Sequence, residues 1–362
     1  MRVLQYASRS VATVALLALA AGCKTDSTAP NAPFDPAGTS ADIAAIDQSF
    51  EAPAMDAYAA ASSQIGAVVG GSAAAAVLAV PSAAITSGGK AGALRYAASL
   101  AKQYQTGTLR PSLSTAAIPA EYLGKTFEWD VETDTYVASD LTGAPSSGVR
   151  FLLYAVNPIT NLPVEPLVEI GYADIIASET ATSATVHVIV VSAGVTYLDY
   201  AVVASGSASS ANVSISGYAT NGNDRVNFDL ETTLTGSEAA GLGIGIDYLL
   251  VLPTRGGFQL EIEAATTGIF TEATTTTADL LARGDHGTVT VQGAETNGAG
   301  SYEVEVNGEL FATITVTGEA PPVIVGADGQ PLSEAEQAAL MAIWFMFYQG
   351  FDFFEDLTDP IA

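Results

Sequence analysis

Apolar and polar residues alternate along most of the second half of this chain, and this pattern constrains the fold more than any other feature of the sequence. In a β-strand, successive side chains point to opposite faces, so such alternation predicts strands with one apolar face and one solvated face. The solvated positions are often acidic. The clearest stretches are residues 225–231, 258–263 and 302–306, in which Phe228, Leu260 and Val304 are central apolar residues.

Turn signals separate these stretches and predict how the strands connect. Asn221-Gly222, Asn297-Gly298 and Asn307-Gly308 are pairs that favour tight turns, and Asn307-Gly308 predicts a type I′ hairpin between residues 302–306 and 309–317. The strands follow one another locally, which favours antiparallel pairing of sequence neighbours. We therefore predict a mainly β fold, in which an antiparallel curved sheet or half-barrel meander wraps an apolar C-terminal helix.

The C-terminal segment predicts that helix over residues 333–349. Ser333 and Glu336 form the pattern of a capping box, and Gly350 is a typical stop signal. Residues 338–348 are almost entirely apolar, which is typical of a helix buried on all sides. We expect it to lie in the concave face of the sheet. Four aromatic residues are either part of the core or candidates for binding an apolar ligand: Trp344, Phe345, Phe347 and Tyr348.

The N-terminus has the features of a targeting segment. Arg2 and Arg9 precede an apolar run at residues 11–21, which is too short to span a bilayer, and small residues lead to Cys23. Cys23 is the only cysteine of the chain, so neither an intramolecular disulfide nor a multi-cysteine metal site can form.

The residues Leu19-Ala20-Ala21-Gly22-Cys23 resemble the lipobox of bacterial lipoproteins. The resemblance implies that residues 1–22 are a lipoprotein signal peptide and that Cys23 is the lipidated first residue of the mature protein. It implies a cell-envelope protein held on a membrane through a palmitate-type acyl anchor. Lys24, where an inner-membrane protein would often carry Asp, favours the outer membrane.

The remaining chain divides by composition into further regions. Residues 23–39 are rich in Pro, Ser and Thr and predict a tether, with Thr39 and Ser40 as N-cap candidates for the helix that follows. Residues 40–120 are rich in Ala and Gly and predict a helical region, with a second helix from about residue 55 to residue 69. Residues 121–362 form the antiparallel β domain with the C-terminal helix.

Charge limits the functions that this chain can have. The net charge is −27, and residues 127–362 contain 32 acidic and 4 basic residues. This excludes a nucleic-acid binder that works through phosphate contacts, because such binding requires the opposite charge. Glu128, Asp130, Glu132 and Asp134 have a spacing of two, which would place them on one face of a strand. They form either a solvated face or part of a calcium site, and no other cofactor is expected.

No catalytic residue can be assigned from the sequence. A nucleophile elbow of the G-x-S-x-G type does not occur. His187 is expected to be a mostly buried histidine with a hydrogen-bond partner, and His286 to lie in an exposed turn.

Three functions therefore remain open. The first is a non-enzymatic envelope lipoprotein that binds an apolar or amphipathic ligand, including lipid, or has a structural role. Its architecture would resemble half-barrel carriers of the lipoprotein-localisation type. The second is a cation-dependent interaction or adhesion module with an acidic face that binds cations or a basic partner. The third is a hydrolase with an unrecognised site.

Overall fold

The computed structural model describes residues 34–69, 118–180, 183–206, 210–237, 241–269, 271–318 and 320–358. The predicted signal peptide, Cys23 and most of the tether lie outside these residues. So does the greater part of the predicted Ala/Gly-rich helical region.

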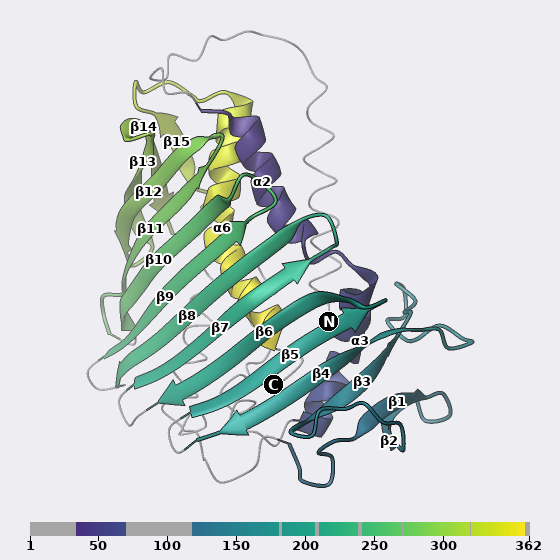
Figure 1. Ribbon diagram of the computed structural model, residues 1–362. Helices are drawn as coiled ribbons and strands as arrows, with labels where there is room; N and C mark the ends of the chain where they lie inside the picture. The colour runs from purple at the N-terminus through teal and green to yellow at the C-terminus, as the bar shows by residue number, and fades with distance from the viewer. Residues whose placement is uncertain are drawn as a thin grey trace.

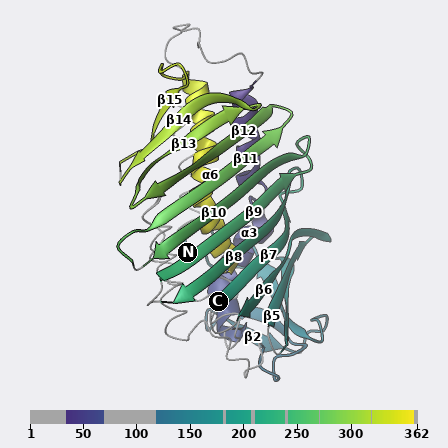
Figure 2. The same cartoon turned by 90° about the vertical axis from the view of Figure 1, so that its left-hand side faces the viewer.

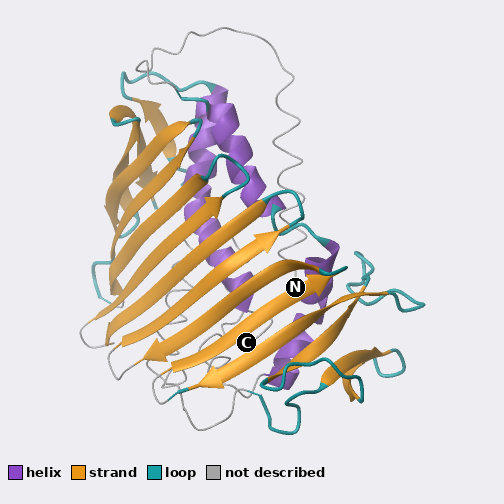
Figure 3. Ribbon diagram, viewed as in Figure 1, coloured by secondary structure: helices purple, strands orange, loops and turns teal. Residues whose placement is uncertain are grey.

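A single open sheet of 15 strands dominates the described chain (Figures 1 and 3). Strands that follow one another in the sequence are neighbours from β3 to β15, and the order at the other end is β3-β1-β2. All pairs are antiparallel except β1 and β3, which are parallel. The predicted mainly β, antiparallel sheet is therefore confirmed. The strands are β1 Thr126–Asp130, β2 Thr135–Ser139, β3 Gly148–Tyr154, β4 Glu169–Glu179, β5 Ser183–Ser192, β6 Val195–Gly206, β7 Ser210–Thr220, β8 Arg225–Ser237, β9 Gly241–Leu252, β10 Phe258–Ile269, β11 Thr275–Gly284, β12 Gly287–Thr296, β13 Ala299–Val306, β14 Glu309–Thr317 and β15 Val323–Gly326.

The predicted hairpin at Asn307-Gly308 joins β13 to β14. Asn307 and Gly308 have φ angles of 51° and 80°. Positive φ at both central residues is the requirement of a type I′ turn, and its twist matches that of the flanking strands. Asn297-Gly298 has the same backbone signature between β12 and β13, with φ angles of 50° and 85°.

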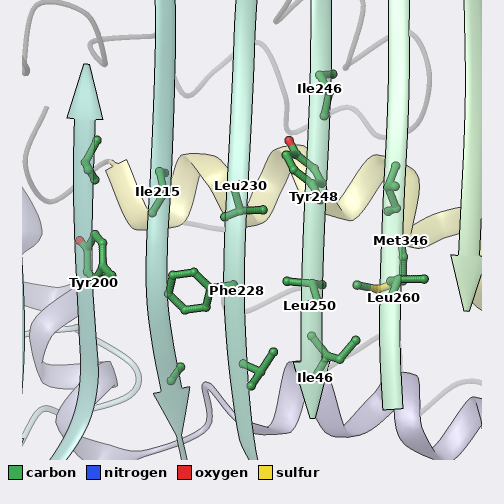
Figure 4. Close-up of a cluster of buried hydrophobic side chains, with 14 of the residues drawn as sticks. Ile46, Tyr200, Ile215, Phe228, Leu230, Ile246, Tyr248, Leu250, Leu260 and Met346 are labelled. Carbon is green, nitrogen blue, oxygen red and sulfur yellow. The ribbon is translucent and has the colours of Figure 1, made fainter. Parts of the chain in front are cut away.

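The helices α2 (Pro36–Gln48), α3 (Pro53–Val69) and α6 (Glu334–Thr358) lie on one face of the sheet (Figures 1 and 2). α2 packs against α6 and β9, α3 packs against strands β3 to β6, and α6 also contacts β11. Most of the buried apolar residues of the strands lie on the face that these helices cover. Figure 4 shows part of this core, in which Ile46 of α2 and Met346 of α6 lie over Leu230, Leu250 and other residues of the sheet.

The start of α2 differs from the prediction. Asp35, rather than Thr39 or Ser40, is the N-cap, and its Oδ1 accepts a hydrogen bond from the backbone N–H of Gly38 at 3.1 Å. Pro36 then occupies the first helical turn, where its missing N–H has no cost and its φ is already helical. The tether predicted over residues 23–39 therefore ends before Pro36.

The end of α6 also differs from the prediction. The capping box at its start is present, because the backbone N–H of Ser333 donates to Glu336 Oε2 at 2.9 Å and the N–H of Glu336 donates to Ser333 Oγ at 3.3 Å. The helix does not stop at Gly350 and continues to Thr358. Glycine costs only about 1 kcal/mol inside a helix, and the apolar spacing of Phe347, Phe351 and Phe354 continues past it.

Candidate functional site

The predicted acidic strand row does not form. Glu128 and Asp130 belong to β1, but the chain turns directly afterwards, so Glu132 and Asp134 lie in the turn between β1 and β2. Asp130 stabilises this turn: its carboxylate accepts hydrogen bonds from the backbone N–H of Glu132 at 3.0 Å and from the hydroxyl of Thr133 at 2.8 Å. The bond from Glu132 also lowers the pKa of Asp130. Asp favours turns because its carboxylate accepts hydrogen bonds from nearby backbone N–H groups. The two-residue spacing of the acidic residues does not reveal this preference.

The C-terminal aromatic residues divide between the core and the surface. Trp344 is 2% exposed, and its ring meets that of Tyr302 edge to face at 4.7 Å. Phe345 is 46% exposed, so the prediction that α6 is buried on all sides is wrong. The side chains of Phe347 and Tyr348 lie outside the described part. Trp344 therefore belongs to the core, as one of the two interpretations expected.

His187 lies on the outer face of the sheet, the face away from the helices. Its Nε2 is 2.7 Å from Oδ1 of Asp199 on β6, and its side chain is 38% exposed. The prediction of a partnered histidine is confirmed, but the prediction that it is mostly buried is wrong. Buried and partly exposed residues alternate along β5. Ile189 and Val191 lie on the same outer face as His187, and their apolar side chains led to the prediction that this face is buried.

His286 lies in the turn between β11 and β12, as predicted, but it contacts the start of α2. Its Nδ1 is 3.2 Å from Oδ2 of Asp35, and its Nε2 is 3.7 Å from Oδ2 of Asp42. Asp42 is buried, and this burial raises its pKa, while the charges of His286 and Arg255 act in the opposite direction. These contacts join α2 to the sheet.

A line of carboxylates crosses the outer face of β8 to β11. Glu231 is directly opposite Asp247, Asp247 is opposite Glu263, and Glu263 is opposite Asp279. All four are exposed. We call these residues the carboxylate row. Directly opposed side chains on one face of a sheet have Cβ atoms about 5 Å apart, so four like charges lie side by side.

Polar residues continue the carboxylate row at both ends. The side-chain amide of Asn212 on β7 donates to Glu231, and that of Gln292 on β12 donates to Asp279 Oδ2 at 2.6 Å. Glu303 on β13 is opposite Gln292 in turn. A nearby outer-face carboxylate, Glu261, has a cationic partner in Arg283 at 3.4 Å, an exposed pair. The result is an anionic line that runs across the strands.

This line does not have the geometry of a metal site. Calcium takes six to eight oxygen ligands that converge on one point. Among the residues that the structure describes, no three Asp, Glu, His or Cys side chains are grouped so that they could hold a metal ion. The carboxylates lie in a line and point away from the sheet, which suits contact with an extended partner better than chelation.

A shallow hollow lies close to the first residue of the carboxylate row. Its volume is about 410 Å3, and it is open to solvent. Its walls are mainly hydroxyl and amide side chains from β6, β7 and β8, including Asn212, which also donates to Glu231. The full lining is Ser205, Ser210, Ala211, Asn212, Thr233, Leu234 and Thr235.

Comparisons with known proteins provide no further guide. No protein family, curated protein or solved structure matches this chain. None of the described helices is long and apolar enough to cross a membrane. The carboxylate row was not anticipated from the sequence, because each of its residues is only one acidic position among many. Its signal is the register that aligns four strands.

Proposed function

We propose that this protein is a non-enzymatic lipoprotein of the cell envelope that binds a basic macromolecular partner through the outer face of its sheet. The partner would be a polycation or a protein with a line of Lys or Arg side chains. This is the interaction-module alternative, and the acidic surface that supports it is the carboxylate row on β8 to β11. Lipidation at Cys23 and an outer-membrane location remain part of the proposal.

The carboxylate row is the observation that carries the proposal. Like charges directly opposite one another destabilise a sheet, so four of them in line have a cost to folding. A cationic partner would remove that cost on binding and would bring charge complementarity, which gives specificity and fast association. An extended partner can contact all four carboxylates at once because they lie in a straight register across the strands.

The carrier alternative receives less support from the geometry. A half-barrel carrier holds its ligand on the concave apolar face. Here α2, α3 and α6 lie on that face, and Trp344, Met346 and Ile46 pack into it. The hollow of about 410 Å3 lies elsewhere, beside the carboxylate row, and five of its seven lining residues carry hydroxyl or amide side chains.

Binding of poly-L-lysine tests the proposal, measured by isothermal titration calorimetry at about 150 mM salt with the full protein. The row variant replaces Glu231→Gln, Asp247→Asn, Glu263→Gln and Asp279→Asn. We expect it to bind at least about tenfold more weakly than the native protein, because the aligned charges contribute most of the contact. Calcium alone, titrated in parallel, should give no saturable binding to the row.

A matched control distinguishes the effect of the carboxylate row on binding from the effect of net charge alone. The control variant removes four exposed carboxylates that lie outside the row, by Glu121→Gln, Asp140→Asn, Glu272→Gln and Glu309→Gln. Both variants change the net charge equally. If the control weakens binding as much as the row variant, the row has no special role and the proposal is wrong.

A further inference from the structure

One edge of the sheet presents exposed apolar side chains that the proposed outer face does not explain. Because strands β3 to β14 alternate in direction, the connections after β3, β5, β7, β9, β11 and β13 lie at the same edge. The turn after β1 joins them because β1 is parallel to β3. Both ends of α2 bond to this edge: the N–H of Asp35 donates to the carbonyl of His286 at 3.0 Å, and Asn221 Nδ2 donates to the carbonyl of Gln48 at 2.8 Å. We call this line of strand ends and turns the α2 edge, which is distinct from the unpaired side of a terminal strand.

Five large apolar residues are exposed at the β1 to β6 part of the α2 edge. They come from the turn after β1, the connection from β3 to β4, and the start of β6, which are neighbours in the sheet. Their exposed fractions are high for side chains of this kind, and Ile159 reaches 87%. We call them the apolar turn cluster: Val131, Ile159, Leu162, Val168 and Val195.

Ile159 is held at the tip of an ordered projection. In the connection from β3 to β4, the N–H of Ala155 donates to the carbonyl of Val168 at 2.9 Å, and the N–H of Asn157 donates to Leu162 at 2.9 Å. The side chain of Asn157 accepts from the N–H of Ile159 at 2.9 Å. These hydrogen bonds are thus made within the projection, and the side chains of Ile159 and Leu162 are exposed.

The tether reaches the folded protein at the same edge. Phe34 contacts Phe311 near the start of β14, with ring centroids 5.9 Å apart, and Asp35 bonds to His286. Ten residues lie between Cys23 and Phe34, so the chain takes eleven steps from one to the other. Fully extended, they span at most about 40 Å. A lipid on Cys23 would therefore hold the β11 to β14 part of the α2 edge within about 40 Å of the bilayer.

From these observations we propose that the apolar turn cluster is a membrane-contact site that inserts into the bilayer interface and adds a second contact to that of the lipid anchor. Transfer of exposed apolar side chains out of water is favourable, so such a contact would add to the membrane affinity that the lipid anchor provides. The inference rests on the lipid anchor of the proposed function. It leaves the carboxylate row facing sideways, away from the lipid surface.

The charge around the apolar turn cluster indicates which lipids it would contact. Glu132, Asp134, Glu165 and Glu169 lie in or next to the same turns. An anionic lipid surface would repel these carboxylates, so the expected surface is a zwitterionic one. Phosphatidylcholine or phosphatidylethanolamine vesicles are the matching probes.

Fluorescence quenching by brominated lipid tests the site. The native residues Trp129 and Trp344 are 8% and 2% exposed, so a tryptophan introduced on the surface reports separately. We compare Ile159→Trp with Leu141→Trp, which lies in the connection from β2 to β3 at the opposite edge and is 49% exposed in the native protein. Each variant, as the full lipidated protein, is reconstituted in vesicles of brominated phosphatidylcholine.

We expect strong quenching and a blue shift of the emission for Ile159→Trp, and neither for Leu141→Trp. Equal quenching of both, or quenching of neither, would overturn the membrane-contact site; the second result would instead favour a protein partner for the cluster. A sedimentation assay with the Cys23→Ser full chain provides an independent readout. There, Ile159→Asn with Leu162→Asn should lower vesicle binding about tenfold or more.

These outcomes are separate from those of the proposed function. Mass spectrometry of the same sample reports whether Cys23 carries a diacylglycerol. An unmodified Cys23 would contradict the lipoprotein assignment, and the quenching with added vesicles would still decide the membrane-contact site. Loss of poly-lysine binding in the row variant bears only on the outer face.

Discussion

At the scale of single residues, two buried tyrosines form a hydrogen-bonded pair between a helix and the sheet. The hydroxyls of Tyr58 on α3 and Tyr200 on β6 are hydrogen-bonded at 3.1 Å, and both residues are buried. Burial raises the pKa of both hydroxyls well above 10.0. The pair joins a helix to the sheet over a separation of 142 residues. Neither tyrosine could be recognised as a partner from its own neighbourhood in the sequence.

Replacing one member of this pair should cost more than replacing both. Tyr200→Phe removes the bond to the buried Tyr58 hydroxyl, and we expect the free energy of unfolding to fall by about 1–3 kcal/mol. Tyr58→Phe combined with Tyr200→Phe removes both hydroxyls and should cost less than the single variant. Urea denaturation measures both. A double variant that is less stable than Tyr200→Phe would contradict the pairing.

The same pair predicts a dependence on alkaline pH. Because the pKa of Tyr58 is raised in the folded protein, the folded chain keeps a proton that the unfolded chain loses above pH 10.0. The free energy of unfolding should therefore fall as the pH rises above that value. It should fall less steeply in the Tyr58→Phe/Tyr200→Phe variant, as followed by urea denaturation at several pH values.

At the scale of elements, β2 is the last strand at one end of the sheet, so its outer edge has no neighbouring strand. Gln64 of α3 covers part of the free edge of β2: its Oε1 accepts from the N–H of Tyr136 at 2.7 Å, and its Nε2 donates to the carbonyl of Asp134 at 3.1 Å. The side-chain amide thus takes the place of a neighbouring strand. Unpaired strand edges invite association with other chains, so this contact shields part of the β2 edge from such pairing.

Gln64→Ala should expose that edge. We expect the amide hydrogen of Tyr136 to exchange faster with solvent, because its hydrogen-bond acceptor is removed. Hydrogen–deuterium exchange measures this directly. The control is Gln48→Ala, an exposed glutamine whose bond to Asn221 uses only the backbone carbonyl. Unchanged exchange at Tyr136 in the Gln64 variant would show that Gln64 does not protect the edge.

The carboxylate row makes a second prediction at this scale, which concerns stability rather than binding. Asp247→Asn removes the charge between Glu231 and Glu263, so we expect the free energy of unfolding to rise by about 0.2–1 kcal/mol at low salt. The gain should disappear near 1 M salt, where screening acts within about 3 Å. Thermal unfolding checks this against Glu272→Gln, a turn carboxylate outside the row. An equal gain in that control would mean that only net charge matters.

At the scale of the whole molecule, segments far apart in the sequence close one face of a sheet that is otherwise open. α2 near the start of the described chain packs against α6 near its end, and both cover strands from the middle of the chain. Each strand contacts mainly its own neighbours, so the helices provide the contacts that cross the sheet. The stability of the sheet as a whole therefore depends on α6 remaining in place.

Two adjacent aromatic residues of α6 test this dependence. Trp344 is 2% exposed and packs on Tyr302, so Trp344→Ala should lower the free energy of unfolding by about 3–5 kcal/mol. Phe345 is 46% exposed, so Phe345→Ala should change it by no more than about 0.5 kcal/mol. Denaturant unfolding gives both values. Similar costs for the two variants would show that α6 does not pack as described.

The sequence by itself determined the features that depend on near neighbours. Alternation predicted the strands, Asn307-Gly308 predicted its hairpin, and Ser333 with Glu336 predicted the start of α6, because each pattern acts within a few residues. The same local reasoning was wrong at residues 128–134, where a single strand was predicted. There the hydrogen bonds of the Asp130 side chain to Glu132 and Thr133 stabilise a turn instead.

Only the tertiary structure decided which residues meet. The carboxylate row depends on the register of four strands, and a shift of one residue in any of them would move its carboxylate to the buried face. The contact of His286 with α2 and the pairing of Tyr58 with Tyr200 depend on which face the helices cover. These relations follow from packing across the sheet, whose free energy is a sum over many distant residues and leaves no pattern in a short stretch of sequence.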